Sequence, residues 1–135
     1  MRHSRIRAAR WVGASLVLAA GAIHLYLYFN YFHRVPTIGP MFLLNAGTAA
    51  LVAVAIVAWD QVASLVAGLL YAAGTLAAFF ISVAVGLFGF QERLRGPWQE
   101  RAGVIEAVAV VLFAVLIAVR ARRVADSARS RLQGT

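Results

Sequence analysis

Nine polar or ionisable side chains of this sequence lie inside long apolar stretches. Polar and ionisable groups are costly in such surroundings, so they are the first candidates for function. A pairing of His24 with Glu106 could handle a proton, form half of a metal site or make a purely structural hydrogen bond, and the residues alone leave these three possibilities open. The full set is His24, Asn30, Asn45, Thr48, Ser64, Tyr71, Thr75, Ser82 and Glu106.

Four of these polar residues are predicted to share one layer, one from each apolar stretch. Counted from the predicted outer ends at about 1.5 Å per helical residue, their depths are about 8 to 12 Å. The four residues are His24, Asn45, Ser82 and Glu106. We therefore expect Glu106 to approach His24 or Asn45.

Helical phase extends the predicted site along the first stretch. His24, Tyr28 and Tyr31 have the spacing i, i+4 and i+7, which places them on one helical face. We expect this face to point into the bundle, while Leu25 and Phe29 point outward. The predicted ligand-binding or interhelical polar layer therefore comprises His24, Tyr28, Tyr31, Asn45, Ser82 and Glu106.

Several kinds of catalytic site are missing from the sequence. There is no cysteine, and no glycine-rich phosphate loop, HExxH motif or Ser/His/Asp set appears. One carboxylate and one histidine at mid-depth do not supply the ligands of a di-metal centre. We predict no catalytic residue and no metal ligand, and a stand-alone enzyme is not favoured. No cofactor is required, although a quinone or a lipid would suit the polar layer.

The composition indicates which elements must position these residues. Of 135 residues, 62% are hydrophobic and only 13% are charged, with a mean hydropathy of +0.79. A soluble domain carries about a quarter charged residues, so a soluble enzyme and a disordered tail are excluded. The net charge of +8 comes from arginines concentrated at both ends, which points to a membrane and not to nucleic acid.

The uncharged stretches predict a single membrane domain, residues 1–135, that is an all-α bundle of four transmembrane helices. Each stretch is long enough, or nearly so, to cross the hydrocarbon layer, which takes about 20 residues. A cleavable signal peptide is disfavoured because the first apolar run is too long and ends in aromatic residues. The predicted helices are 11–33, 40–59, 61–90 and 98–120, with basic tails at 1–10 and 120–135.

Arginine placement predicts the orientation of the helices. The two tails carry nine arginines, against four in the loops after the first and third helices. By the positive-inside rule both termini are cytoplasmic, in the cell (inner) membrane. The tails are also expected to contact anionic lipids.

Two segments resemble a family of small four-helix membrane proteins found in actinobacterial genomes. They are the run HLYLYF beginning at His24 and the run PTIGPMFLLN from Pro36 to Asn45. A looser similarity is to the DoxX-like four-helix proteins, some of which are associated with quinone-linked redox complexes. No functional residue carries over from either resemblance.

Three functions are compatible with these features. Small size and the lack of catalytic sets favour an accessory or interaction subunit of a larger membrane complex, or a homo-oligomer. The alternative is a small-molecule, quinone or lipid-binding membrane protein that uses the polar layer. A small transporter ranks third, because those proteins often insert in both orientations and the arginine bias here is strong.

Overall fold

The apolar stretches form four helices in a computed structural model, which describes residues 2–91 and 97–133. Each of the four is long and apolar enough to cross a membrane. Within the described residues the β-type structure is a single bridge between Leu87 and Phe90, so the all-α prediction is confirmed for this part of the chain. The elements are α1 (Arg2–Leu27), the short π-helical turn η1 (Tyr28–Phe32), α2 (Ile38–Ala58), α3 (Val62–Ala84) and α4 (Pro97–Gln133).

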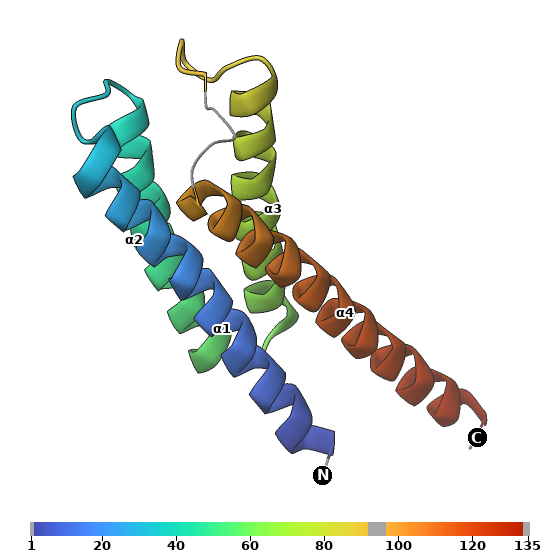
Figure 1. The fold of residues 1–135 in the computed structure, drawn as a ribbon. Helices are drawn as coiled ribbons and strands as arrows, with labels where there is room; N and C mark the ends of the chain where they lie inside the picture. The colour runs from blue at the N-terminus through green and yellow to red at the C-terminus, as the bar shows by residue number, and fades with distance from the viewer. Residues whose placement is uncertain (1, 92–96, 134–135) are drawn as a thin grey trace.

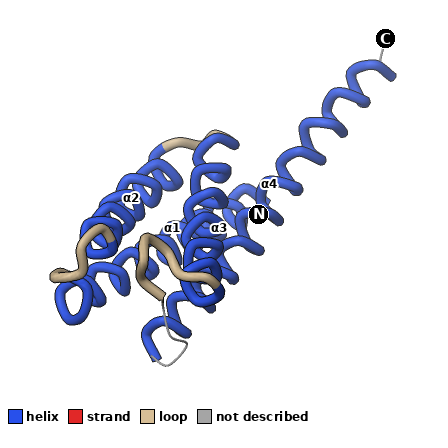
Figure 2. Tube along the Cα trace, turned by 90° about the horizontal axis from the view of Figure 1, so that it is seen from above, coloured by secondary structure: helices blue, strands red, loops and turns tan. Residues whose placement is uncertain are grey.

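The helices pack mainly as neighbours along the chain. Figure 1 shows α1 lying along α2, with α4 crossing in contact with both α1 and α3. Seen from above, the last turns of α4 extend well beyond the other helices (Figure 2). We call the end with the α2–α3 turn (residues 59–61) and both arginine-rich segments the arginine end. The opposite end, with η1 and residues 85–91, is the aromatic end.

With η1 counted as the end of the first helix, three helix bounds differ from the prediction by more than two residues. The basic segments continue the helices, so α1 begins at Arg2 and α4 runs to Gln133. Arg and Ala are strong helix formers and neither segment contains Pro before the helix ends, so the helices propagate into them. The third difference is the C-terminal end of α3, which stops at Ala84 and not at residue 90. The helix ends there because Gly86 adopts a φ of +84° and its N–H bonds to the carbonyl of Ile81 at 3.1 Å.

Phe113 of α4 is the centre of the core. Its side chain is 0% exposed and lies between two glycines, Gly13 of α1 and Gly68 of α3. A Cβ at Gly68 would lie 2.6 Å from the Phe113 Cζ atom, and one at Gly13 would lie 2.8 Å from its Cε1 atom. Small residues thus let α1, α3 and α4 approach closely, as is usual where apolar helices must associate without a hydrophobic drive.

Candidate functional site

Three side chains form a hydrogen-bonded group that joins α2 to α3. The Tyr71 hydroxyl donates to Asn45 Oδ1 at 2.7 Å, and Asn45 Nδ2 donates to Thr75 Oγ1 at 3.0 Å. Thr75 Oγ1 in turn donates to the Tyr71 carbonyl at 2.9 Å. Both ends of the Asn45 amide are therefore engaged, and the partners of Asn45 come from α3.

A cleft of about 360 Å³ lies beside this group, between α2 and α3 and toward the aromatic end. Its walls are mainly apolar, and it reaches the outer surface of the bundle, since Leu44 in its lining is 70% exposed. Three residues of the predicted layer, His24, Asn45 and Ser82, come together here. The polar residues in the lining are His24, Asn45, Thr48, Tyr71, Thr75 and Ser82.

Two hydroxyls in the cleft are unpaired. Neither Thr48 nor the buried Ser82 makes a hydrogen bond to any other described residue. The cleft therefore offers two groups that can each donate to, and accept from, a bound molecule.

His24 adds a third free polar atom. Its Nδ1 lies 2.8 Å from the Ala20 carbonyl, which can only accept, so Nδ1 carries the hydrogen. In the neutral ring Nε2, on the opposite edge, is then a bare acceptor. The ring also packs on Phe42, with 5.1 Å between ring centroids, which holds its orientation in the cleft wall.

The prediction that Tyr28 and Tyr31 point into the bundle with His24 fails for Tyr31, which is 60% exposed. Tyr28 is half-buried and packs against Phe29 and His33 outside the cleft. The reason is the π-helical turn η1, in which the His33 N–H bonds to the Tyr28 carbonyl at 2.8 Å. One extra residue in that turn shifts the inward face from position 31 to Phe32, which is buried.

Glu106 is buried, with 2% of its surface exposed, but it does not make the predicted contact. It forms no hydrogen bond with His24 or Asn45, and its Oε1 has no hydrogen-bond partner among the described residues. It also does not reach toward Arg101, whose guanidinium stacks on Trp98 at 4.7 Å.

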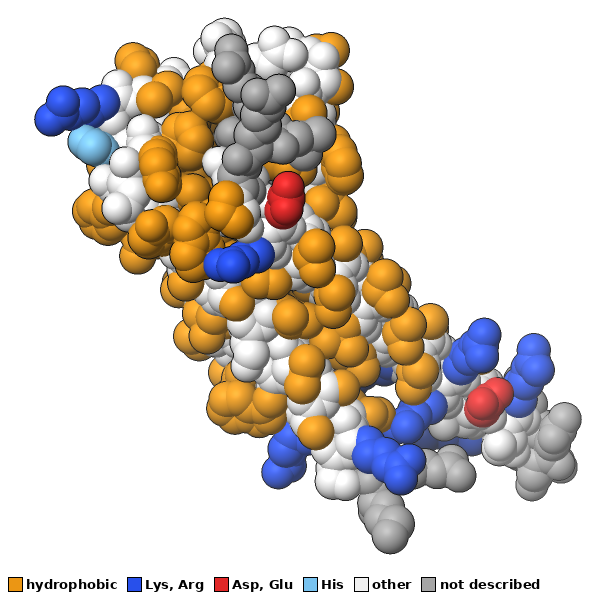
Figure 3. Space-filling view, in the orientation of Figure 1, with side chains coloured by type: hydrophobic (Ala, Val, Ile, Leu, Met, Phe, Trp, Pro, Cys, Tyr) orange, Lys and Arg blue, Asp and Glu red, His pale blue; other side chains and the backbone are white. Residues whose placement is uncertain are grey.

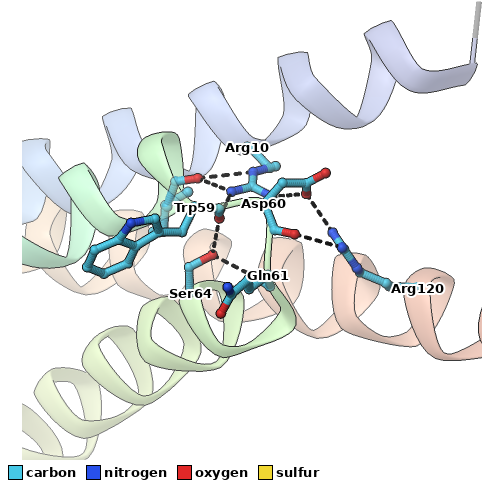
Figure 4. Close-up of polar contacts among 7 residues, drawn as sticks. Arg10, Trp59, Asp60, Gln61, Ser64 and Arg120 are labelled. Carbon is cyan, nitrogen blue, oxygen red and sulfur yellow. Dashed lines mark hydrogen bonds and ion pairs between the residues drawn. The ribbon is translucent and has the colours of Figure 1, made fainter.

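A second polar cluster, absent from the sequence prediction, lies at the arginine end (Figure 4). Arg10 of α1 donates to the carbonyls of Ile56 and Trp59 and to the Asp60 carboxylate. Arg120 of α4 bonds to the same carboxylate at 2.6 Å and to the Asp60 carbonyl at 2.8 Å. We call Arg10, Asp60 and Arg120 the arginine clasp.

The arginine clasp connects α1 and α4 to the C-terminal end of α2 and caps that end. A cation near the last carbonyls of a helix satisfies them and complements the helix dipole, which is the role of Arg10 at the end of α2. The Ser64 hydroxyl donates to the carbonyls of Trp59 and Gln61 at 3.0 and 2.8 Å and so completes the turn. The charges of Arg10, Asp60 and Arg120 can be read from the sequence. That they pair with one another cannot, because it depends on how α1 and α4 pack.

The electrostatics of the arginine clasp keep Asp60 ionised. Its hydrogen bond from Arg120, with the positive charges of Arg120, Arg10 and Arg7, lowers the pKa of the Asp60 carboxyl below its ordinary value. A lowered pKa means that pairing stabilises the fold at neutral pH, and that this contribution is lost as the pH falls through the lowered value. The contribution is small because the Asp60 side chain is largely exposed.

No group of three potential metal-ligating side chains occurs in the part of the chain that the structure describes. Comparison with protein-family models, with curated proteins and with solved structures gave no match. The fold is thus that of a small four-helix bundle with a lateral cleft and an arginine clasp. The function proposed below depends on the geometry of these two sites.

Proposed function

We propose that the chain is a multi-pass protein of the cell (inner) membrane with both termini in the cytoplasm, and that it binds a lipid-soluble quinol in the α2–α3 cleft. Four apolar helices of spanning length support the membrane location. Most of the basic side chains in view lie at the lower end and along the extension of α4 in Figure 3, while the surface between the two ends is mainly hydrophobic. The positive-inside rule then makes the arginine end cytoplasmic.

The orientation can be tested with single cysteines, because the protein has none of its own. In sealed right-side-out vesicles, a membrane-impermeant maleimide should label His33→Cys at the aromatic end. It should label Ser130→Cys in α4 only after the vesicles are opened. Labelling of both before opening, or the reverse pattern, would contradict the proposed topology.

The unpaired polar atoms of the cleft support the ligand class. A mainly apolar cavity with a few convergent polar groups is the usual form of a small-molecule site. His24 Nε2 can accept a hydrogen bond from a hydroxyl, and the Thr48 and Ser82 hydroxyls can bond to a second oxygen. The reduced, hydroxyl-bearing quinol suits a bare Nε2 better than the oxidised quinone, whose carbonyl oxygens can only accept.

The open side of the cleft fits a ligand that arrives through lipid. Leu44 and Gly74 in the lining are both exposed on the surface that would face the hydrocarbon. A quinol ring would then lie among the polar groups while its apolar tail remains among the lipid chains. No soluble domain or water-filled entry is needed for such a ligand to enter.

Two glycines provide a matched test of the cleft. A Cβ at Gly74, which lines the cleft, or at Gly47, which does not, would meet no atom within 4 Å. Gly74→Phe should therefore fold and fill the cleft. With a short-chain ubiquinol analogue and protein in nanodiscs, we expect calorimetry to show binding weakened about tenfold or more by Gly74→Phe.

Gly47→Phe is the control for bulk and for helix propensity, and its affinity should stay within about twofold of the parent protein. His24→Leu should also weaken binding of the quinol, because it removes the acceptor but keeps an apolar side chain. Equal affinities in the parent protein and Gly74→Phe, or no binding by a folded parent protein, would overturn the proposed ligand site.

A second candidate function is that of an accessory subunit in a larger membrane complex. It is favoured by an outward face of α2 on which Gly47, Ala50 and Val54 share one side and are exposed. Small residues on such a face allow another helix to approach closely. The two glycine variants separate the candidates, because Gly47→Phe should disrupt assembly with a partner in native membranes whereas Gly74→Phe should not.

A further inference from the structure

A second, larger cleft lies at the arginine end, between the first turns of α1 and the extension of α4. Its volume is about 1140 Å³, and side chains from both helices and from the α2–α3 turn line it. If the arginine end is cytoplasmic, as proposed above, this cleft lies at the level of the inner lipid headgroups.

The charge of this cleft is strongly positive and mostly uncompensated. Five arginines and one acid line it, and that acid, Asp60, is already shared by Arg10 and Arg120. The other three arginines, Arg7, Arg123 and Arg131, form no ion pair with any described residue. Like charges held this close repel one another, so an anion that enters the cleft is favoured.

The walls of the same cleft are apolar. Ile6 and Trp11 line it from α1, and Leu116, Val119 and Val124 line it from α4. Trp11 and Val124 are both exposed, although they lie beside the arginines. A site for a soluble phosphate compound would not need this apolar surface, whereas a phospholipid has acyl chains to cover it.

The spacing of residues along α4 explains why both kinds of side chain face the cleft. Arg123, Ser127 and Arg131 follow one another at intervals of four, and Arg120 and Val124 lie beside them on the same side. Arg122 and Arg129 are also exposed on α4 but do not line the cleft. One side of the extension, with both basic and apolar residues, therefore faces the cleft.

We infer that this cleft binds the headgroup of a phospholipid with two phosphates, of the cardiolipin class, drawn from the inner leaflet. Three unpaired guanidiniums exceed what one phosphate can engage in paired hydrogen bonds, since each can bond a phosphate through two N–H groups. Basic pockets between helices on the cytoplasmic side are suited to such headgroups. The apolar walls would hold the first segments of the acyl chains.

The test compares two double variants that remove the same charge. Arg123→Gln with Arg131→Gln changes the lining, and Arg122→Gln with Arg129→Gln changes the opposite side of the same helix. With purified protein titrated with cardiolipin and analysed by native mass spectrometry, we expect the first pair to weaken binding about tenfold or more. The second pair should change it by less than about threefold.

Competition experiments distinguish a lipid headgroup from free phosphate as the ligand. Phosphatidylcholine should not compete with cardiolipin, and millimolar inorganic phosphate should not displace it. Equal loss in both double variants would overturn the site, because it would show attraction to the overall charge. Displacement by inorganic phosphate, or equal retention of phosphatidylcholine, would overturn the proposed ligand. Gly74→Phe should leave cardiolipin binding unchanged, so this test does not depend on the quinol site.

Discussion

Gly68→Leu should strongly destabilise the folded bundle, whereas Gly74→Leu, less than two turns further along α3, should leave its stability nearly unchanged. A Cβ at Gly68 would lie within 2.9 Å of three ring atoms of Phe113. Gly13 lies at a similarly short distance from the same end of the ring, so α1 and α3 together confine it. The remaining Leu atoms would need space that the core does not have.

The expected cost of Gly68→Leu is about 3 kcal/mol, since overpacking a close-packed core costs about 1 to 3 kcal/mol and Phe113 is fully buried. That is a large part of the stability of a small domain. The free energy of unfolding can be measured by titration of the purified protein with denaturing detergent. Gly74→Leu is the control, because it adds the same side chain in open space.

A second variant identifies the cause of this loss. Phe113→Ala combined with Gly68→Leu should recover part of the stability, because the new side chain would occupy the space that the ring leaves. Similar unfolding of Gly68→Leu and Gly74→Leu would show that Phe113 is not clamped between the two glycines. A double variant less stable than either single variant would lead to the same conclusion.

Arg10→Ala should produce the largest loss of stability among the arginine variants. The Arg10 side chain is 7% exposed and donates to two carbonyls and one carboxylate. Its removal leaves the carbonyl of Ile56 without its arginine partner at the end of α2. Losing charged hydrogen bonds to two carbonyls at the end of a helix costs about 2 to 3 kcal/mol, and losing the pair with the exposed Asp60 adds little.

Two further variants serve as controls for Arg10→Ala. Arg120→Ala should cost about 1 kcal/mol, because its ion pair with Asp60 is more exposed. Arg10→Lys should restore only part of the loss, since an ammonium cannot bond the carbonyls and the carboxylate as a planar guanidinium does. Detergent unfolding of the three variants gives the comparison, and equal stability of Arg10→Ala and Arg120→Ala would rule out a buried clasp.

Depth along each helix could be predicted from the sequence, but rotation about the helix axis could not. Counting residues brought His24, Asn45 and Ser82 into one region, and all three line the α2–α3 cleft. The same counting placed Glu106 at that depth, yet its carboxyl makes no hydrogen bond to His24 or Asn45. Which face of α4 meets which helix is decided by packing around Phe113, and no periodicity in the chain specifies it.

Local backbone geometry was the other source of error. Tyr31 was assigned to the inward face on the assumption of a regular α-helix, and the π-helical turn changed its phase. The arginine-rich segments are predicted as tails because they contain no long apolar run, although their helix propensity is high. The arginine clasp was missed because its members are separated by 50 and 60 positions in the chain.

Because α4 is one uninterrupted helix, a change in the tilt of its packed part also moves its C-terminal extension. At about 1.5 Å per residue, its 37 residues reach about 55 Å, well beyond a hydrocarbon layer of about 30 Å. No proline lies within α4 after its first residue, so the part outside the layer must follow the part inside. A tilt of about 10° would displace the tip of a 20 Å extension by roughly 3 to 4 Å. Small reorientations among the packed helices would therefore move the charged C-terminal end of α4 outside the hydrocarbon layer.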